Sequence, residues 1–338
     1  MKKLGVIILN WNGERLLKQF IPTASRYTIS EEADLIVADN GSSDNSTYWL
    51  RANHPEVKVI EFDRNYGFAE GYNRAIREVD YPYVVLLNSD VEVSEGWWQP
   101  MLAFMEANPD VGALQPKIRS FRDKRMFEYA GAAGGYLDRL GYPYCRGRLF
   151  DSVEEDNGQY DGEPADICWA SGACLMTRRD LYIRLGGLDP KFFAHMEEID
   201  LCCRILNAGF RVCMLPDSAV FHVGGASLAQ GNPQKTYLNF RNNLLLLHKN
   251  LPRKKGKHKI FIRRLADSLA FMMFAVKMDF ANARAILKAH RDFRRMRGEY
   301  TDFPENDILS QQPGANKNAI LERYIFRKKN ISVDPHKP

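Results

Sequence analysis

One stretch of the sequence, "VVLLNSDVEV", leads an apolar run straight into a carboxylate. Val84 to Leu87 are apolar, and Asn88, Ser89 and Asp90 follow them. A buried strand of this kind presents its last residues at a sheet edge, where open α/β sheets bind ligands. Asp90 suits a hard divalent cation that bridges phosphate oxygens, because Mg²⁺ takes one or two carboxylates from the protein. The alternative is that Asp90 only caps the following turn.

A second acidic group lies in "HMEEIDLCCRIL", where Glu197, Glu198 and Asp200 open a segment with helical apolar spacing. Acidic residues in a first turn complement the positive end of the helix dipole, which explains one or two of the three. The preceding "LGGLDPKFFAH" is rich in glycine and aromatic residues, so it can bring a substrate close to the backbone. A carboxylate at this place could act as a general base.

The elements that must position these acids alternate along the chain. Four apolar runs, Leu4–Leu9, Leu35–Ala38, Val57–Ile60 and Val84–Leu87, are separated by stretches with helical spacing. This order predicts an α/β fold with a Rossmann-like, mostly parallel sheet flanked by helices. The carboxyl ends of such strands meet at one crevice. The polar residues that we expect there are Asn10, Asn12, Asp39, Asn40, Asn65, Gly67, Asn88, Ser89 and Asp90.

The first turn of this sheet does not carry a dinucleotide or P-loop signature. It reads "NWNGERLL", with one glycine, and neither G-x-G-x-x-G nor G-x-x-x-x-G-K-[ST] occurs in the chain. Asp39 could still bind a ribose or a base, because a carboxylate accepts from a hydroxyl or a ring N–H. The alternative for "DNGSSD" is an Asn-Gly turn with a Ser or Asp helix cap.

Composition narrows the class of protein. The 338 residues are 45% hydrophobic and carry a net charge of +5, which allows a sizeable core and makes nucleic acid an unexpected partner. The six cysteines lack paired C-x-x-C spacing, so we expect reduced, buried thiols and a cytoplasmic protein. Asn10 and Asn12 interrupt the first apolar run too early for a signal peptide, which favours a core strand there.

Several blocks of the sequence resemble a known family. In order and spacing, "VIILNWNG", "IVADNGSSDNS", "NYGFAEGYNRAI" and "VVLLNSDVEV" resemble the nucleotide-binding half of family 2 glycosyltransferases. The segment from "ASGACLMTRR" to "NAGFRV", then "AVFHVGGAS" and "YLNFRNNLLLL", resembles the acceptor half of their rhamnosyltransferase-like members, which build bacterial polysaccharides. The resemblance reaches from Met1 to about Leu251 and implies the glycosyltransferase-A fold. It adds Asn73 and Arg74 to the expected donor-binding residues.

The resemblance implies an inverting enzyme that moves a sugar from a nucleotide-diphosphate sugar, dTDP-rhamnose or a UDP-sugar, to a saccharide or lipid-linked acceptor. It implies Mg²⁺ or Mn²⁺ at Asp90, although the family often has Asp-x-Asp where this chain has Asn88-Ser89-Asp90. It also places His222 near the metal and the diphosphate, and the alternative is a structural histidine. Imidazole suits Mn²⁺ better than Mg²⁺.

The family's base lies in a Glu-Asp-x-Asp motif, so the resemblance puts Glu198 in the position of the catalytic base, with Glu197 as the fallback. For the acceptor we expect Trp169, Ser171 and Gly172, since an aromatic face packs well on a sugar ring. The alternative for the tryptophan is a place in the core. Residues 120–164 show weak periodicity and are expected to be an excursion on the acceptor side that orders on binding.

The region after Leu251 changes in composition. "PRKKGKHKIFIRR" precedes a helical stripe in which Phe271 and Phe274 widen the apolar face. The uncharged part, Ser268–Val276, is too short to span a bilayer, so we expect a helix on the surface of an anionic membrane. The alternative is packing on the catalytic domain or on a second copy of the chain in a homodimer. The stripe consists of Leu265, Leu269, Met272, Val276 and Phe280.

These observations divide the chain into a catalytic domain, 1–251, a basic amphipathic helical extension, 252–301, and a polar tail, 302–338. The catalytic domain has a nucleotide-sugar half, 1–118, and an acceptor half, 119–251. We expect a position in the cytoplasm, peripheral on the membrane. Two other functions remain open. A nucleotidyltransferase normally has a glycine-rich, basic first loop that "NWNGERLL" does not supply, and a non-catalytic sugar-nucleotide binding module is the third reading.

Overall fold

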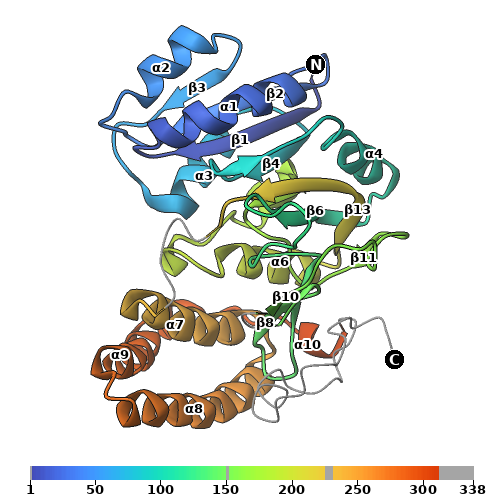
Figure 1. Ribbon diagram of the computed structural model, residues 1–338. Helices are drawn as coiled ribbons and strands as arrows, with labels where there is room; N and C mark the ends of the chain where they lie inside the picture. The colour runs from blue at the N-terminus through green and yellow to red at the C-terminus, as the bar shows by residue number, and fades with distance from the viewer. Residues whose placement is uncertain (1, 150–151, 225–230, 312–338) are drawn as a thin grey trace.

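A computed structural model describes residues 2–149, 152–224 and 231–311 (Figure 1). A central sheet of nine strands has the order β11-β13-β6-β12-β4-β1-β2-β3, and β5 pairs with β13. The strands are β1 (Leu4–Asn10), β2 (Ala33–Asp39), β3 (Lys58–Glu61), β4 (Tyr83–Leu87), β5 (Val91–Glu92), β6 (Val111–Ser120), β11 (Ala165–Asp166), β12 (Cys174–Arg178) and β13 (Arg211–His222).

Helices cover both faces of this sheet because its strands are apolar on both sides. In β1, Val6 and Ile8 join the core on one face with Leu17 of α1, whereas Ile7 joins the core on the other face with Tyr72 of α3. This two-faced burial confirms the predicted Rossmann-like architecture. The helices are α1 (Glu14–Thr28), α2 (Ser46–Asn53), α3 (Gly67–Glu78), α4 (Gln99–Ala107), α5 (Arg179–Arg184) and α6 (Glu197–Asn207).

The direction of the strands changes in the middle of the sheet. β1, β2, β3 and β4 are parallel neighbours, but β12 runs antiparallel between β4 and β6. The chain therefore enters β12 at the edge where β4 ends. The backbone N–H of Asn88 donates to the carbonyl of Ala173 over 3.0 Å, which joins the end of β4 to the segment before β12.

Residues 120–164 contain structure that the sequence pattern did not reveal. Four short strands within this region form a second, antiparallel sheet, and the side chains of Phe127, Tyr136 and Tyr160 in the same region are buried. Strands of two or three residues are too short to show a period of two, so the sequence pattern did not reveal them. They are β7 (Gly135–Leu137), β8 (Pro143–Cys145), β9 (Arg148–Leu149) and β10 (Ser152–Val153).

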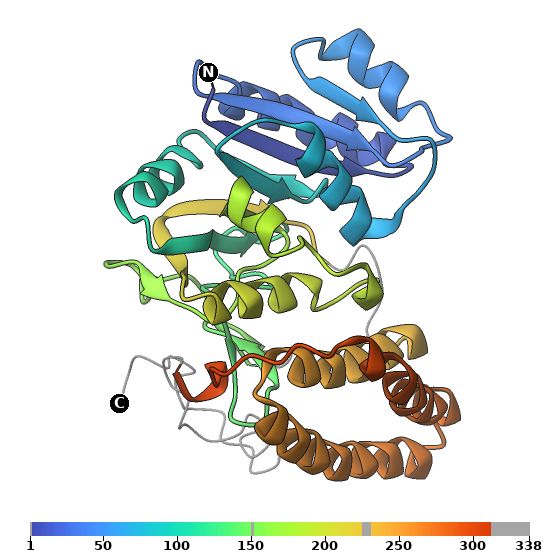
Figure 2. The ribbon, with the colours of Figure 1, turned by 180° about the vertical axis from the view of Figure 1, so that it is seen from behind.

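The C-terminal part is a group of helices below the sheets, and α8 is the one farthest from the central sheet (Figures 1 and 2). α7 packs against α6, α8 and α9. None of the described helices is long and apolar enough to cross a membrane. Of the predicted polar tail, residues 312–338 lie outside the described residues. The elements are η1 (Pro190–Phe192), α7 (Pro233–Asn250), α8 (Arg253–Val276), α9 (Phe280–Met296), η2 (Arg297–Glu299) and α10 (Ile308–Gln311).

Candidate active site

The ends of β1 and β2 form one side of the crevice. Asn10 and Asp39 are register partners in the parallel pair, and the Asn10 side-chain amide donates to Asp39 Oδ1 over 2.8 Å. Ser42 donates its backbone N–H and its hydroxyl to the same carboxylate, over 2.9 and 2.6 Å. Asn12 adopts a positive φ of 50° and accepts from the backbone N–H of Ser43 over 2.8 Å. The two strand ends are thus held as one polar surface.

The end of β3 joins the same surface through Asn40. Its side-chain oxygen accepts from the Tyr66 N–H over 2.9 Å, and its amide donates to Asn65 Oδ1 and to the Gly67 carbonyl, both over 3.0 Å. Gly41 has a φ of +71°, and a Cβ there would lie 2.5 Å from the backbone of Arg64, so a side chain at this position would separate the two loops. The predicted convergence of strand ends is therefore present.

Asn73, which was expected to bind the donor, has another environment. Its side chain donates to the Leu188 carbonyl over 2.7 Å and accepts from the Tyr182 hydroxyl over 2.7 Å. It is buried and ties α3 to the loop after α5, so these contacts do not support a donor-binding role. Arg74 stacks on Tyr66 at 3.7 Å, which keeps its guanidinium beside the loop that ends β3.

At the end of β4, Asp90 lies beside a histidine and a second carboxylate. Asp90 Oδ1 is 3.1 Å from His222 Nε2, and Glu128 Oε2 is 3.4 Å from His222 Nδ1, without hydrogen-bond alignment. All three residues are buried. Burial lowers the pKa of the imidazole, but the interactions with Asp90 and Glu128 outweigh it and raise that pKa to about 9. Asn88 completes the group, with its amide nitrogen 3.4 Å from His222 Nε2.

This group fits a divalent cation held by two residues. Ligands on adjacent corners of an octahedron with bonds of about 2.1 Å lie about 3 Å apart, close to the Asp90–His222 distance. Glu128 faces His222 Nδ1, the nitrogen that does not face Asp90. In many proteins a carboxylate in this position orients a histidine that binds a metal through its other nitrogen. Asp90 and Glu128 face opposite nitrogens of the His222 ring. The two carboxylates and the imidazole therefore cannot all bind one ion. Accordingly, no cluster of three such side chains suited to a metal occurs among the described residues.

The second acidic site begins α6. Burial raises the pKa of Glu198 to about 7, and burial together with the charge of Glu198 raises the pKa of Glu197 well above its usual range. Glu198 is partly exposed, whereas Glu197 is buried with an unpaired Oε2. Asp200 is fully buried and paired with Arg204 at 2.7 Å and Lys249 at 2.9 Å. Its contacts therefore support a structural role, not the expected catalytic one.

The loop before α6 is strained and is held from α7. Phe193, His195 and Met196 all adopt positive φ, between 68° and 72°. The Asn242 amide nitrogen lies within 2.9 Å of the carbonyl oxygens of Phe192, Ala194 and His195. Since left-handed conformations cost energy in non-glycine residues, the loop needs such partners. These contacts from Asn242, which we call the Asn242 clamp, therefore determine how the chain enters α6 and where Glu198 lies.

Arg241 extends the same clamp. Its guanidinium donates to the carbonyls of Lys191 and Phe192 over 3.0 and 2.8 Å. Both Arg241 and Asn242 belong to the "YLNFRNN" block and are buried.

The residues expected to bind the acceptor separate into two kinds. A Cβ on Gly172 would lie 3.8 Å from the Cβ of Glu198, so this glycine faces the candidate base. Ser171 is buried, and its hydroxyl donates to the Ala130 carbonyl over 2.7 Å. Trp169 is 5% exposed, and its indole N–H donates to the Tyr136 carbonyl over 3.0 Å. The tryptophan is a core residue, as the alternative had it, and cannot present its face to a sugar.

Two residues of this region were not selected from the sequence, Glu128 and Asn242. Glu128 lies in the stretch whose short strands gave no pattern, and a single asparagine on an apolar helix gives no sign that it is buried and bonded to a loop.

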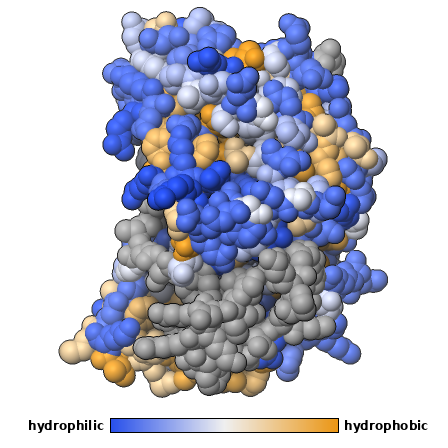
Figure 3. Space-filling view, turned by 45° about the vertical axis from the view of Figure 1, so that its right-hand side comes forward, coloured by the Kyte–Doolittle hydropathy of each residue, from blue (hydrophilic) through white to orange (hydrophobic). Residues whose placement is uncertain are grey.

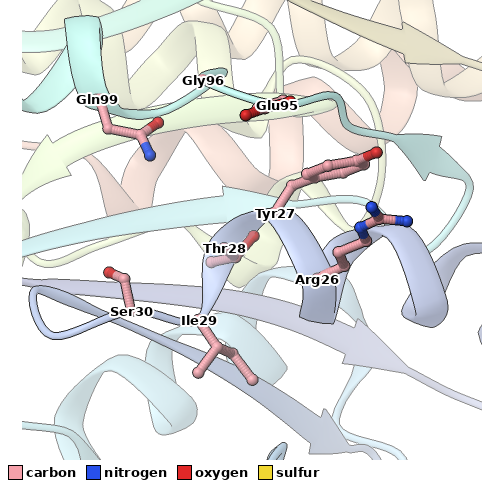
Figure 4. A pocket seen from close by; sticks show the side chains of 8 residues that line it. All are labelled: Arg26, Tyr27, Thr28, Ile29, Ser30, Glu95, Gly96 and Gln99. Atoms are coloured by element: carbon pink, nitrogen blue, oxygen red, sulfur yellow. The ribbon is translucent and has the colours of Figure 1, made fainter.

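A cavity of 310 Å³ lies elsewhere, between the C-terminal end of α1 and the segment before α4 (Figure 4). Arg26, Tyr27, Glu95 and Gln99 are among the residues that line it. α1 ends near the amino ends of the strands, so this cavity is away from the crevice and contains none of the expected site residues.

The chain is similar in fold to solved glycosyltransferase structures at low sequence identity. One is GalNAc-T7 with UDP, GalNAc and Mn²⁺, with a TM-score of 0.59 at 17% identity over 74% of this chain and 48% of that one. The mannosyltransferase PcManGT of Pyrobaculum calidifontis with GDP-Man and Mn²⁺ gives a TM-score of 0.51 at 16% identity, over 88% of this chain and 84% of that one. These likenesses confirm the predicted glycosyltransferase-A fold.

Relatives in sequence include rhamnosyltransferases and a hexosyltransferase. N-acetylglucosaminyl-diphospho-decaprenol L-rhamnosyltransferase of Mycobacterium tuberculosis is 26% identical over 65% of this chain and 75% of its own length. Rhamnosyltransferase WbbL of Escherichia coli is 23% identical over 64% and 82%. The low-salt glycan biosynthesis hexosyltransferase Agl10 of Haloferax volcanii is 25% identical over 72% and 74%.

The family model for glycosyl transferase family 2 matches residues 5–185, which include every strand end of the crevice and the segment that faces Glu198. With that match, the chain belongs to glycosyl transferase family 2.

Proposed function

We propose that the protein is an inverting glycosyltransferase that moves a sugar from a nucleotide-diphosphate sugar to an acceptor hydroxyl in the assembly of a cell-surface polysaccharide. One observation carries the proposal. The segment Gly172–Ala173 touches both acidic sites, since Ala173 bonds to Asn88 beside Asp90 and Gly172 faces Glu198. The proposed diphosphate site and the proposed base would thus border the same crevice.

The two sites would divide the reaction between them. The acceptor oxygen attacks the anomeric carbon, and the bond from that carbon to the diphosphate oxygen breaks, with its electron pair leaving on the diphosphate. Glu198 takes the acceptor proton, and a base with a pKa near 7 is well matched to that task. A single displacement of this kind inverts the anomeric configuration.

Asp90 and His222 are the residues that would hold Mg²⁺ or Mn²⁺. When bound, such an ion neutralises charge on the departing diphosphate. Two relatives in structure contain Mn²⁺, which supports this part of the proposal. The polar surface of Asn10, Asp39 and Asn40 would receive the nucleoside.

The donor and the acceptor are inferred from the relatives. The mycobacterial relative is named for rhamnose transfer to N-acetylglucosaminyl-diphospho-decaprenol, and a solved S. aureus TarS structure contains UDP-GlcNAc. We therefore propose dTDP-rhamnose or a UDP-sugar as donor and a saccharide or a lipid-linked saccharide as acceptor. The work would take place in the cytoplasm, peripheral on the membrane, where the lipid of such an acceptor is held.

The test is a panel of dTDP- and UDP-sugars with Mn²⁺, with mass detection of the product and assay of free nucleoside diphosphate. The proposal expects a glycosylated acceptor and one nucleoside diphosphate released for each sugar moved. Release of sugar 1-phosphate instead, with the nucleotidyl group moved to the acceptor, would indicate a nucleotidyltransferase. Tight donor binding without any turnover, across acceptors, would indicate a binding module.

A further inference from the structure

The outward face of α8 carries a continuous row of exposed apolar side chains. Five residues form this row, and at 100° of rotation per residue they lie within an arc of about 80° around the helix axis. They are between 51% and 84% exposed, although each is large and apolar. We call them the α8 stripe: Phe261, Leu265, Leu269, Met272 and Val276.

The stripe lies opposite the side of α8 that packs on the protein. Gly256, Ile260, Arg263 and Asp267 are buried on that inner side. Phe271 and Phe274, which were expected to widen the apolar face, are partly buried and do not belong to the stripe. Figure 3 shows apolar side chains gathered along the lower edge of the molecule, where α8 lies. Single exposed apolar residues are ordinary, but a row of this length marks an interaction surface.

The apolar surface continues past the end of α8. Met278 is 74% exposed at a positive φ of 58°, and Phe280 at the start of α9 is 52% exposed. Leu287, which also lies in α9, is 56% exposed.

The segment that contains α8 and α9, residues 252–301, accounts for the net positive charge of the protein. Residues 252–301 contain fourteen Lys and Arg against four Asp and Glu, a net charge of +10, whereas the whole chain carries +5. The remaining 288 residues are therefore acidic on balance, at −5. Lys254, Lys257 and Arg264 are exposed and flank the stripe on α8.

α8 is fixed to its neighbours. The Arg263 guanidinium stacks at 3.4 Å on Tyr142, which lies in the turn between β7 and β8, and His290 of α9 bonds to Asp267 over 3.0 Å. Whatever binds the stripe therefore acquires a defined position relative to the sheets.

We propose that the α8 stripe and its flanking cations dock the protein on an anionic lipid surface, with the apolar row entering the interface and the cations facing lipid phosphates. Apolar side chains bordered by Lys and Arg are the pattern of helices that lie in a membrane surface. A second copy of the chain fits less well, because two faces of the same positive charge repel each other. Nucleic acid would match the charge but has no counterpart for the apolar row. The proposal does not depend on the proposed function, because docking needs no catalysis.

The experiment is co-sedimentation of the full chain with vesicles of phosphatidylglycerol and phosphatidylcholine, compared with phosphatidylcholine alone. We expect binding to the anionic vesicles at low salt and partial release at high salt. The combined variant Leu265→Ser, Leu269→Ser, Met272→Ser should lose binding at least tenfold. The control is Tyr48→Ser, since Tyr48 is 76% exposed on α2 and should leave binding unchanged.

Circular dichroism establishes that each variant is folded. A folded parent that ignores anionic vesicles at low salt would overturn the proposal, and so would a triple variant that binds as the parent does. If light scattering shows that the parent is a dimer and the triple variant a monomer, the α8 stripe is a contact between copies and the lipid proposal is wrong. Sugar transfer by a parent that ignores vesicles would leave the proposed reaction intact and overturn only the membrane location.

Discussion

The side-chain amide nitrogen of Asn242 lies 2.7 Å from the backbone carbonyl oxygen of His195. This contact reaches from α7 to a residue with a positive φ, two positions before Glu197. The backbone of the loop is unfavourable by itself, so its shape depends on partners of this kind. Asn242 therefore contributes to the position of the candidate base without contacting it.

Replacing Asn242 with Ala should lower the rate constant for transfer by about tenfold or more and leave donor affinity nearly unchanged, since small displacements of a catalytic group are costly. The pH profile should also move, because a shifted Glu198 has a different environment. The matched control is Asn243→Ala. Asn243 is the next residue, is equally buried, and donates to the Gly141 carbonyl over 2.7 Å, away from the strained loop. Equal losses in both variants would mean that the effect is only one of stability.

Glu198→Gln should lower transfer by about 100-fold or more while donor binding stays near that of the parent, which is the usual scale for loss of a general base. Calorimetry with donor measures the binding, and product formation measures the rate. Glu197→Gln is the matched comparison at the neighbouring position. If that variant is inactive and Glu198→Gln turns over normally, the base is Glu197.

Transfer should depend on pH through Glu198. The base acts in its ionised form, so kcat/KM should rise with pH to about 7 and then level off. The Glu198→Gln variant should lose this rise. A profile that falls between pH 5 and 7 in the parent would contradict the assignment.

The same pKa makes a prediction about stability. Because the folded pKa of Glu198 is raised, its contribution to stability is complete below the unfolded value of about 4.3 and is lost as pH rises through about 7. Glu198→Gln removes this loss. The variant should therefore gain melting temperature relative to the parent at pH 8, and gain less at pH 5. Thermal unfolding at both pH values measures the difference.

Asp90→Ala should abolish metal-dependent donor binding, because Asn88 and Ser89 supply no second acid. Calorimetry with a UDP-sugar in the presence and absence of Mn²⁺ is the measurement. Glu92→Ala is the control, since Glu92 is a nearby acid whose carboxylate pairs with Lys124. Unchanged metal dependence in Asp90→Ala would show that the cation, if used, is held elsewhere.

Much of the fold could be predicted from the sequence because it depends on the spacing of apolar and polar residues within short segments. Four apolar runs became β1 to β4, and the polar residues after them met at one crevice, since parallel strands place their carboxyl ends together. The helix that begins at Glu197 followed from its apolar spacing and its acidic first turn. These features depend on neighbours a few positions apart.

The tertiary structure decided which polar and aromatic side chains face the crevice. Asn73 and Trp169 had the right type and place in the sequence, but partners more than 30 positions away draw them into the interior. Glu128 reaches His222 because the segment after β6 turns back on that strand, where the Glu128 N–H donates to the Ile118 carbonyl over 3.0 Å, and β6 pairs with β13. On α8, Phe271 is partly buried whereas Leu269 is exposed. The packing of α8 on its neighbours determines which part of its wide apolar face is covered. Periodicity indicates that a face exists, and long-range contacts determine what it meets.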